Sequence, residues 1–346
     1  NPARESLQYS PPETTSVKMK HIRLFPALIW LVVCHPHVFG QSPNIAPRKD
    51  YRDVAATISE FLETELPQKN IPALSIAIVD GDEIVWAQGF GYQDPDNEVA
   101  ATAATVYRVG SVSKLLNDVA VMQLVADGKL DLDADIRRAI PEFAPENPFR
   151  KPITLRQLMN HQGGLVREPP VGHYFDPTEP GLKETVLSLN GTKLVHAPDS
   201  RAKYSNAAVS VAGYAVEKAA GTPFAEHLKK ALLQPLGMTS SSFLAEDPIK
   251  LRLAKAQMWS YDGRRFPAPM FELGTLPAGN LYSTVIDLGQ FMRAILNDGQ
   301  LEGRQVLDAE MLAEMLRPQT GPDGQQRSYG IGFRLGELTT ARAGPP

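Results

Sequence analysis

The most informative segment of the chain spans residues 109–133 and reads VGSVSKLLNDVAVMQLVADGKLDLD. Apolar residues recur in it at the spacing of one helix face, at Leu115, Val119 and Met122. Gly128 follows these repeats, and glycine commonly ends a helix. The segment therefore predicts a helix over residues 111–127.

Ser111 and Lys114 stand at the start of this predicted helix. Residues three apart share a helix face, so these two side chains can meet, whereas Ser113 points elsewhere. A serine hydroxyl becomes an effective nucleophile when a base removes its proton. A lysine amine can be that base when burial or nearby charge lowers its pKa towards about 7–8. The pair predicts a nucleophile and a base that form a covalent acyl-enzyme, with backbone N–H groups of the helix start near the oxyanion.

A second Ser-x-x-Lys pattern occurs at Ser200-Arg201-Ala202-Lys203. It follows Pro198-Asp199 in a polar stretch that lacks helical apolar periodicity. We therefore interpret this copy as a solvated loop, and only the Ser111 copy as a site.

Tyr204-Ser205-Asn206 is the only Tyr-x-Asn in the chain. A tyrosine hydroxyl can pass a proton to a leaving group, and an asparagine amide can orient an acyl substrate. Taken alone, the pattern also fits the ordinary polar start of a helix. Arg167 and Glu168, in a Pro- and Gly-rich loop, are further candidates to reach the same cleft, whereas His161 is interpreted as structural.

Patterns on either side of residues 109–133 predict an α/β fold. Two β-rich runs, 74–79 and 84–90, flank a turn at Gly81-Asp82 and predict a hairpin. The other predicted elements are helices at 51–66, 154–160, 206–220, 224–233 and 281–296, a loop at 166–181 and a strand at 329–335. This order favours a sheet built from both ends of the chain, with a helical insertion between them.

The N-terminal residues predict an exported protein. We interpret residues 1–18, which lack an initiator Met, as an upstream non-native segment. Residues 19–40 combine early positive charge with a short apolar run and a small residue at the end, as a signal peptide does. A linker at 41–50 and a catalytic domain at 51–346 follow, with a helical lobe roughly at 130–275. The predicted location is periplasmic or secreted, without a stable membrane span.

Composition excludes several classes of function. The 346-residue chain is 43% hydrophobic and 21% charged, with a formal net charge of −4 and no basic stripe of the kind that binds nucleic acid. Cys34 is the only cysteine, so disulfides and cysteine zinc sites are excluded. The histidines show no metal-ligand spacing, and we expect no metal and no cofactor. No Gly-x-Ser-x-Gly elbow occurs.

Taken together, these blocks resemble the β-lactamase-related serine hydrolases. That family includes class C β-lactamases, DD-peptidases of the penicillin-binding type and family VIII esterases. The resemblance covers about residues 50 to 335. Beyond residues 109–133 and Tyr204-Ser205-Asn206 it is carried by ITLRQLMNHQGGL at 153–165, LLQPLGMTSSSF at 232–243 and LPAGNLYSTVIDLGQFM at 276–292.

The resemblance implies a β-lactamase/transpeptidase-like fold, an antiparallel sheet flanked by helices plus an all-helical lobe, with the site in the cleft between them. It implies that Ser111 attacks the substrate carbonyl and that Lys114 accepts its proton. Tyr204 would transfer protons to and from the leaving group, and Asn206 would hydrogen-bond the substrate side chain. The Ser111 N–H would be one oxyanion donor.

The chain departs from the family near its end. The family carries a third motif, Lys or His and then Gly two residues later, on a strand after the segment that resembles YGIGF, and none occurs here before Pro346. We therefore expect the C-terminal strands to be missing, and the chain as given to be poorly active.

The sequence is compatible with three functions. The first is hydrolysis of an amide, either a β-lactam or a D-Ala-D-Ala cell-wall peptide. The second is hydrolysis of an ester by the same residues, and the third is a non-catalytic peptidoglycan-binding role. The substrate is thus a small molecule or a cell-wall peptide, and the oligomeric state is open.

Overall fold

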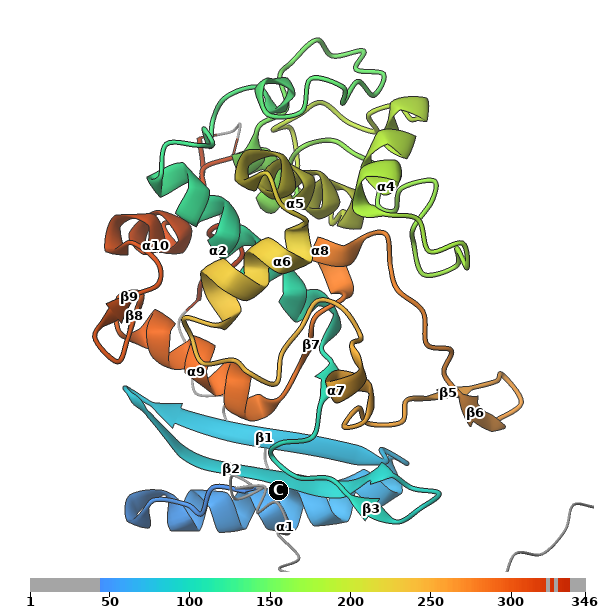
Figure 1. Ribbon diagram of the computed structural model, residues 1–346, viewed down its shortest axis with the longest axis vertical. Helices are drawn as coiled ribbons and strands as arrows, with labels where there is room; N and C mark the ends of the chain where they lie inside the picture. Colours follow the sequence, from blue (N-terminus) through green and yellow to red (C-terminus); the bar gives the residue numbers. More distant parts are fainter. Residues whose placement is uncertain (1–43, 322–323, 327–328, 337–346) are drawn as a thin grey trace, which may run out of the picture. The chain divides into compact units, whose positions relative to one another are not determined.

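The computed structural model describes residues 44–321, 324–326 and 329–336. Its first elements are helix α1 (Arg52–Gln68) and strands β1 (Ala73–Asp80), β2 (Glu83–Asp94) and β3 (Val99–Ala100). The strands form an antiparallel sheet in the order β1-β2-β3, with Ala77 opposite Ala87. Helix α1 covers one face of this sheet, and helix α9 (Val285–Leu296) covers the other (Figure 1).

Apolar packing holds both helices on the sheet. Trp86 and Phe90 of β2 are buried in one cluster with Leu66 of α1. On the other face Gly289 lets α9 approach closely, because a Cβ there would lie 2.8 Å from Ile84 Cδ1. The hairpin is therefore the middle layer of three.

The helical part of the chain is built around α2 (Ser113–Ala126), which packs against α5 (Asn206–Ala220) and α8 (Leu276–Gly279). Other helices are α3 (Leu155–Met159), α4 (Leu182–Ser188), α6 (Phe224–Leu228) with a π-turn at Lys229–Leu233, α7 (Asp247–Lys250) and α10 (Ala309–Leu316). The remaining strands pair as β4 (Tyr107–Arg108) with β7 (Tyr282–Ser283), β5 (Gln257–Trp259) with β6 (Arg265–Pro267), and β8 (Gln300–Leu301) with β9 (Arg304–Gln305). Short 3-10 turns lie at Lys49–Tyr51, Gly110–Val112, Ile136–Arg138 and Leu189–Gly191.

Most of the predicted elements are confirmed. The hairpin, the helix after Ser111 and the loop after residue 166 lie where the patterns indicated. Thr154 caps α3 in a capping box with Gln157, and Thr284 caps α9. Gly221 ends α5 in the left-handed conformation. The fold is the expected mixture of antiparallel sheet and helices.

The strand predicted at residues 329–335 is wrong. Tyr329 and Arg334 form an isolated antiparallel bridge, and the Gly330 N–H donates to Phe333 O at 2.9 Å. Gly332 has a φ of +76° at the bend, where an extended strand cannot continue. The described part of the sheet therefore comes from residues 73–100, and among the described residues the later half of the chain packs α9 on it and adds no strand to it.

Some of the predicted domain boundaries lie outside the described residues, and others differ from the contacts in the structure. Residues 1–18 and the predicted signal peptide at 19–40 lie outside the described residues, so export stays a prediction. Ile45, in the predicted linker, exchanges backbone hydrogen bonds with Ala87 of β2. Helix α2 precedes residue 130, yet it stands at the centre of the helical part. Among the described residues, no helix has the length and hydropathy of a membrane span.

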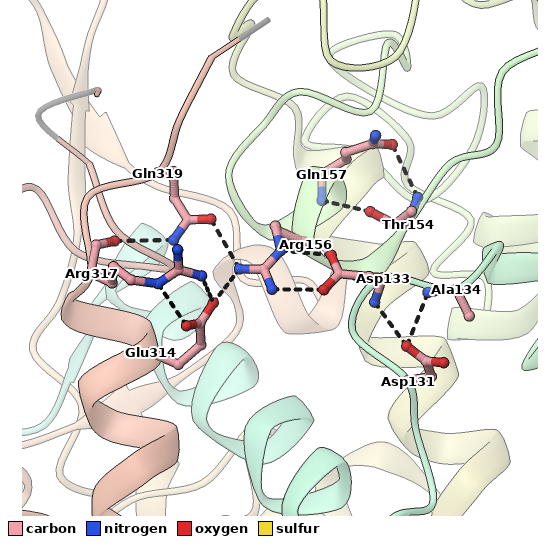
Figure 2. A network of polar contacts seen from close by, with 9 residues as sticks. All are labelled: Asp131, Asp133, Ala134, Thr154, Arg156, Gln157, Glu314, Arg317 and Gln319. Atoms are coloured by element: carbon pink, nitrogen blue, oxygen red, sulfur yellow. Dashed lines mark hydrogen bonds and ion pairs between the residues drawn. The ribbon is translucent and has the colours of Figure 1, made fainter. Parts of the chain in front are cut away.

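Arg156 of α3 ties the end of the described chain to the helical part (Figure 2). Its guanidinium forms two hydrogen bonds with Asp133, at 2.6 and 2.8 Å, and also binds Glu314 of α10. It reaches Gln319 at 3.2 Å as well. Because one side chain joins three segments, it orders residues that are far apart in the sequence.

We expect Arg156→Met to lower the free energy of unfolding by about 1–3 kcal/mol, because it removes the partner of the Asp133 carboxylate and one of the side-chain hydrogen bonds of Gln319, which keeps its bond to Arg317 O. Glu314 keeps Arg317 at 2.6 Å, which limits the loss. Urea denaturation measures it. Arg137→Met is the matched control, since Arg137 pairs with the nearby Asp135 on the surface and should cost no more than about 0.5 kcal/mol. Equal losses of unfolding free energy in the two variants would contradict the proposal that Arg156 stabilises the fold by joining three segments.

Candidate active site

A sharp turn presents Ser111 ahead of α2. Gly110 has a φ of +55°, a conformation that strains any residue with a Cβ. The turn is held to the segment before β7: the Val109 N–H donates to Leu281 O at 2.9 Å, and Ser113 Oγ accepts from the Leu281 N–H at 3.0 Å. Ser113 Oγ also donates to Gly110 O. Ser113 thus supports the turn, and its side chain points away from the Ser111 hydroxyl, as the spacing predicted.

Lys114 lies one turn after Ser111, with its Nζ 3.2 Å from Ser111 Oγ. The same amine donates to Ala278 O in α8 at 2.6 Å. The side chain is buried, with 8% of its surface exposed. Burial lowers the pKa of the Lys114 amine below its usual value, and the hydrogen bond with Tyr204 opposes that shift. Near neutral pH, a larger fraction of such a buried amine is unprotonated than of an exposed lysine amine, and the unprotonated form can accept a proton.

Tyr204 completes the group from the residues just before α5. Its hydroxyl lies 2.7 Å from Ser111 Oγ, and its ring centroid lies 4.8 Å from Lys114 Nζ. The Tyr204 ring centroid also lies 4.6 Å from that of the His161 imidazole and 5.4 Å from the Arg167 guanidinium. The serine oxygen therefore has two polar groups within hydrogen-bond distance, both predicted from the sequence.

Asn206 begins α5 and lies in contact with the loop that follows α3. Its side-chain amide donates to Glu168 Oε1 at 2.7 Å, and its backbone N–H donates to Arg167 O at 2.8 Å. Arg167 and Glu168 therefore contact the residues of the Tyr-x-Asn pattern, but neither lines the pocket that they were candidates to reach. Glu168 Oε2 is buried without a hydrogen-bond partner among the described residues.

His161 sits in the turn after α3 with a φ of +63°. Burial, helped by the nearby charge of Lys114, lowers the pKa of His161 to about 4, so its ring is neutral at physiological pH. Its Nδ1 faces the Ser205 N–H, and its carbonyl accepts from the Lys203 N–H. These contacts agree with the structural role predicted for it.

Ser111, Lys114, Tyr204 and His161 line a pocket of about 1000 Å³, whereas Asn206 is not part of its lining. Its walls come from α2, the turn after α3, residues 200–204 and the bend at 329–334. Asp118, four residues after Lys114, lies in this wall with 1% of its surface exposed. Burial raises the pKa of its carboxyl to about 8. We did not single out Asp118 from the sequence, although its spacing from Lys114 places both on one helix face.

The second Ser-x-x-Lys copy reaches the pocket wall at Ser200, but its serine has other hydrogen-bond partners. Ser200 lies in an exposed loop, where its hydroxyl donates to Ala197 O at 2.7 Å, so the second Ser-x-x-Lys copy is not helical. Over residues 44–321, 324–326 and 329–336, no three His, Cys, Asp or Glu side chains are arranged to hold a metal ion.

Comparison with protein families matches residues 54–344 to the family model described as Beta-lactamase. "Beta-lactamase-like protein 2" of Dictyostelium discoideum is 30% identical over 297 residues, which is 83% of this chain and 52% of that protein. "Protein flp" of Staphylococcus aureus strain N315 is 25% identical over 246 residues, 71% of this chain and 49% of that protein. The chain spans about half the length of these curated relatives.

Solved structures share the fold. The octameric penicillin-binding protein homologue from Pyrococcus abyssi superposes with a TM-score of 0.69 at 25% identity, covering 80% of this chain and 64% of that one. FmtA from Staphylococcus aureus has a TM-score of 0.70 at 22% identity, covering 84% and 78%. EstCE1, described as a hydrolase with promiscuous acyltransferase activity, has a TM-score of 0.67 at 21% identity, covering 81% and 82%.

Proposed function

Because this chain belongs to the β-lactamase family, we propose that it is a serine hydrolase that forms an acyl-enzyme at Ser111. One observation carries the proposal: the Lys114 amine and the Tyr204 hydroxyl both lie within hydrogen-bond distance of Ser111 Oγ. In this proposal Ser111 is the nucleophile, Lys114 the base and Tyr204 the proton carrier, and all three line one pocket.

In the proposed acylation step, Ser111 Oγ forms a bond to the carbonyl carbon and its proton passes to Lys114 Nζ. The carbonyl electron pair moves onto oxygen, where the Ser111 backbone N–H would stabilise the negative charge. The intermediate collapses by breaking the bond to the leaving nitrogen or oxygen. The leaving group takes a proton from the Tyr204 hydroxyl, which regains one from the Lys114 ammonium.

Deacylation uses the same groups in reverse. Water attacks the acyl carbon, and its proton passes to the free amine of Lys114, directly or through Tyr204. When the ester bond breaks, Ser111 Oγ leaves and takes a proton back. The enzyme returns to its starting state. A peptide or ester gives a carboxylic acid and the leaving group released earlier, whereas a β-lactam, whose amine stays tethered to the acyl group, gives a single ring-opened acid.

We propose an amide as the substrate, either a β-lactam or a D-Ala-D-Ala peptide. An amine leaving group needs a proton as its bond breaks, and the Tyr204 hydroxyl at 2.7 Å from Ser111 Oγ is placed to supply one. Asn206 would bind the acyl side chain of this substrate. Its contact with Glu168 holds the amide group in a fixed direction beside the site.

The test compares nitrocefin with a p-nitrophenyl ester, and follows a fluorescent penicillin by intact mass and peptide mapping. We expect one equivalent of adduct, on the peptide that contains Ser111, and faster turnover of the amide. Faster turnover of the ester would identify an esterase with the same residues. Binding without any adduct or turnover would overturn the proposal and favour a peptidoglycan-binding role.

A further inference from the structure

The pocket beside Ser111 carries two arginines that have no role in the acylation and deacylation steps. Arg201 lies three residues before Tyr204, Arg334 lies in the bend at residues 329–334, and both line the pocket together with Ser111. We propose that Arg201 and Arg334 are specificity-determining residues that bind a carboxylate on the leaving group of the substrate. The inference deepens the proposed function and rests on it, because it names the chemical feature by which the protein selects its amide.

Both guanidinium groups are available to a ligand. Arg201 and Arg334 are exposed, and neither side chain forms an ion pair or a hydrogen bond with another described residue. Lys114 is a cation of the same lining, but its amine already donates to Ser111 Oγ and to Ala278 O. Among the described residues of this pocket, the two arginines are therefore the cations that are left to bind an anion.

The acidic group of the pocket does not neutralise these arginines. Among the described residues of the lining the acid is Asp118, which is 1% exposed. The bend covers it closely, since a Cβ at Gly332 would lie 2.9 Å from Asp118 Oδ2. Burial raises the pKa of this carboxyl to about 8, so it is mostly protonated at neutral pH. The lining is thus positively charged in a chain whose formal net charge is −4, and it attracts anions.

The backbone that carries each arginine is held in place. Asp199 and Lys203 donate their N–H groups to carbonyls of the turn after α3, both at 2.8 Å, so the loop with Arg201 is fixed at its two ends. The bend with Arg334 is closed by the bridge to Tyr329 and is hydrogen-bonded to the end of α10. Binding an anion therefore orders two side chains and leaves the backbone as it is, which limits the entropic cost.

The lining relates this pocket to the leaving group. Tyr204, which would protonate the leaving group, lines the pocket, whereas Asn206, which would bind the acyl side chain, does not. A substituent of the leaving group is therefore the part of the substrate that enters beside Arg201 and Arg334. A guanidinium offers paired N–H donors that match the two oxygens of a carboxylate, and it keeps its charge at every pH at which the reaction is measured.

The first test compares an acyl-D-Ala-D-Ala peptide with the same peptide that ends in a carboxamide, so that only the charge of the leaving group differs. The unmodified protein should hydrolyse the free acid with a kcat/KM about 10- to 100-fold higher. Arg201→Gln and Arg334→Gln should each raise KM for the acid by about 3- to 10-fold, with kcat and the carboxamide reaction nearly unchanged. The double variant should show no preference.

Arg150→Gln is the matched control for these variants. Arg150 is likewise exposed and forms no ion pair with a described residue, but it does not line this pocket. It should keep the full preference for the free acid. Equal kcat/KM values for the two peptides in the unmodified protein, or an equal loss of preference in Arg150→Gln, would overturn the inference while the proposed hydrolysis stands.

The second test needs no turnover. Ser111→Ala is titrated with each peptide by calorimetry, alone and combined with Arg201→Gln and Arg334→Gln. The free acid should bind more tightly than the carboxamide, the difference should shrink as the salt concentration rises, and it should vanish without the arginines. Equal affinities, including no measurable binding of either peptide, overturn the inference. If the unmodified protein hydrolyses neither peptide and forms no adduct, yet the arginine-dependent preference in binding is present, the proposed function alone fails.

Discussion

Ser111→Ala is expected to abolish covalent labelling by a fluorescent penicillin and to slow hydrolysis by about 10⁴-fold or more. The reason is that both the Lys114 amine and the Tyr204 hydroxyl lie within hydrogen-bond distance of Ser111 Oγ, and without that oxygen no bond to the acyl carbon can form there. The pocket keeps its shape, because the hydrogen bonds that hold the turn come from Val109 and Ser113. Intact mass and steady-state rates measure both losses.

Ser113→Ala is the matched control for that experiment. It removes a hydroxyl from the same turn, but one that binds Gly110 O and the Leu281 N–H. We expect it to keep the adduct and to lower the free energy of unfolding by about 1–2 kcal/mol. If Ser113→Ala lost labelling and Ser111→Ala kept it, the assignment of the nucleophile would be wrong.

Lys114→Met is expected to lower the rate of acylation by about 10²–10⁴-fold, because no other described amine lies within hydrogen-bond distance of Ser111 Oγ. Lys114→Arg should be as inactive, since a guanidinium stays protonated and cannot accept the serine proton. Both variants keep the serine, so a slow residual adduct should still map to Ser111.

The pH profile of the unmodified protein is a second test of Lys114 as the base. Burial lowers the pKa of Lys114, and the free amine is the reactive form. The rate of acylation should therefore rise as the pH rises through that lowered pKa, at a pH below the usual range of lysine. His161 is neutral throughout, because its pKa is about 4. A profile that is flat over this range, or that Lys114→Arg leaves unchanged, would exclude Lys114 as the base.

Helical periodicity predicted the local part of the site correctly. Ser111 and Lys114 are three residues apart, and a helix brings side chains at that spacing together whatever surrounds it. The 3-10 turn at Gly110–Val112 was not predicted, because the left-handed conformation of Gly110 depends on how the turn docks against Leu281. The pairing of Tyr204 with Ser111 joins residues far apart in the sequence, so it came only from the resemblance to a family.

The bend at residues 329–334 shows where pattern reading failed. Alternating glycine and apolar residues there resemble a strand, yet Gly330 and Gly332 also permit a tight turn. Ile331 donates its N–H to Met315 O and is fully buried, so packing against α10 favours the turn. The sequence pattern at residues 329–334 does not include that contact, because the partner Met315 belongs to α10.

From the sequence alone came most of the elements, the family resemblance and the meeting of Ser111 with Lys114, because each depends on spacing within a helix or on motifs in a fixed order. Tertiary packing placed Asp118 under the bend at Gly332 and buried Lys114 against Ala278, and with them it set the charges around the base. Those charges depend on how much water the surrounding chain removes, which spacing along the sequence does not specify.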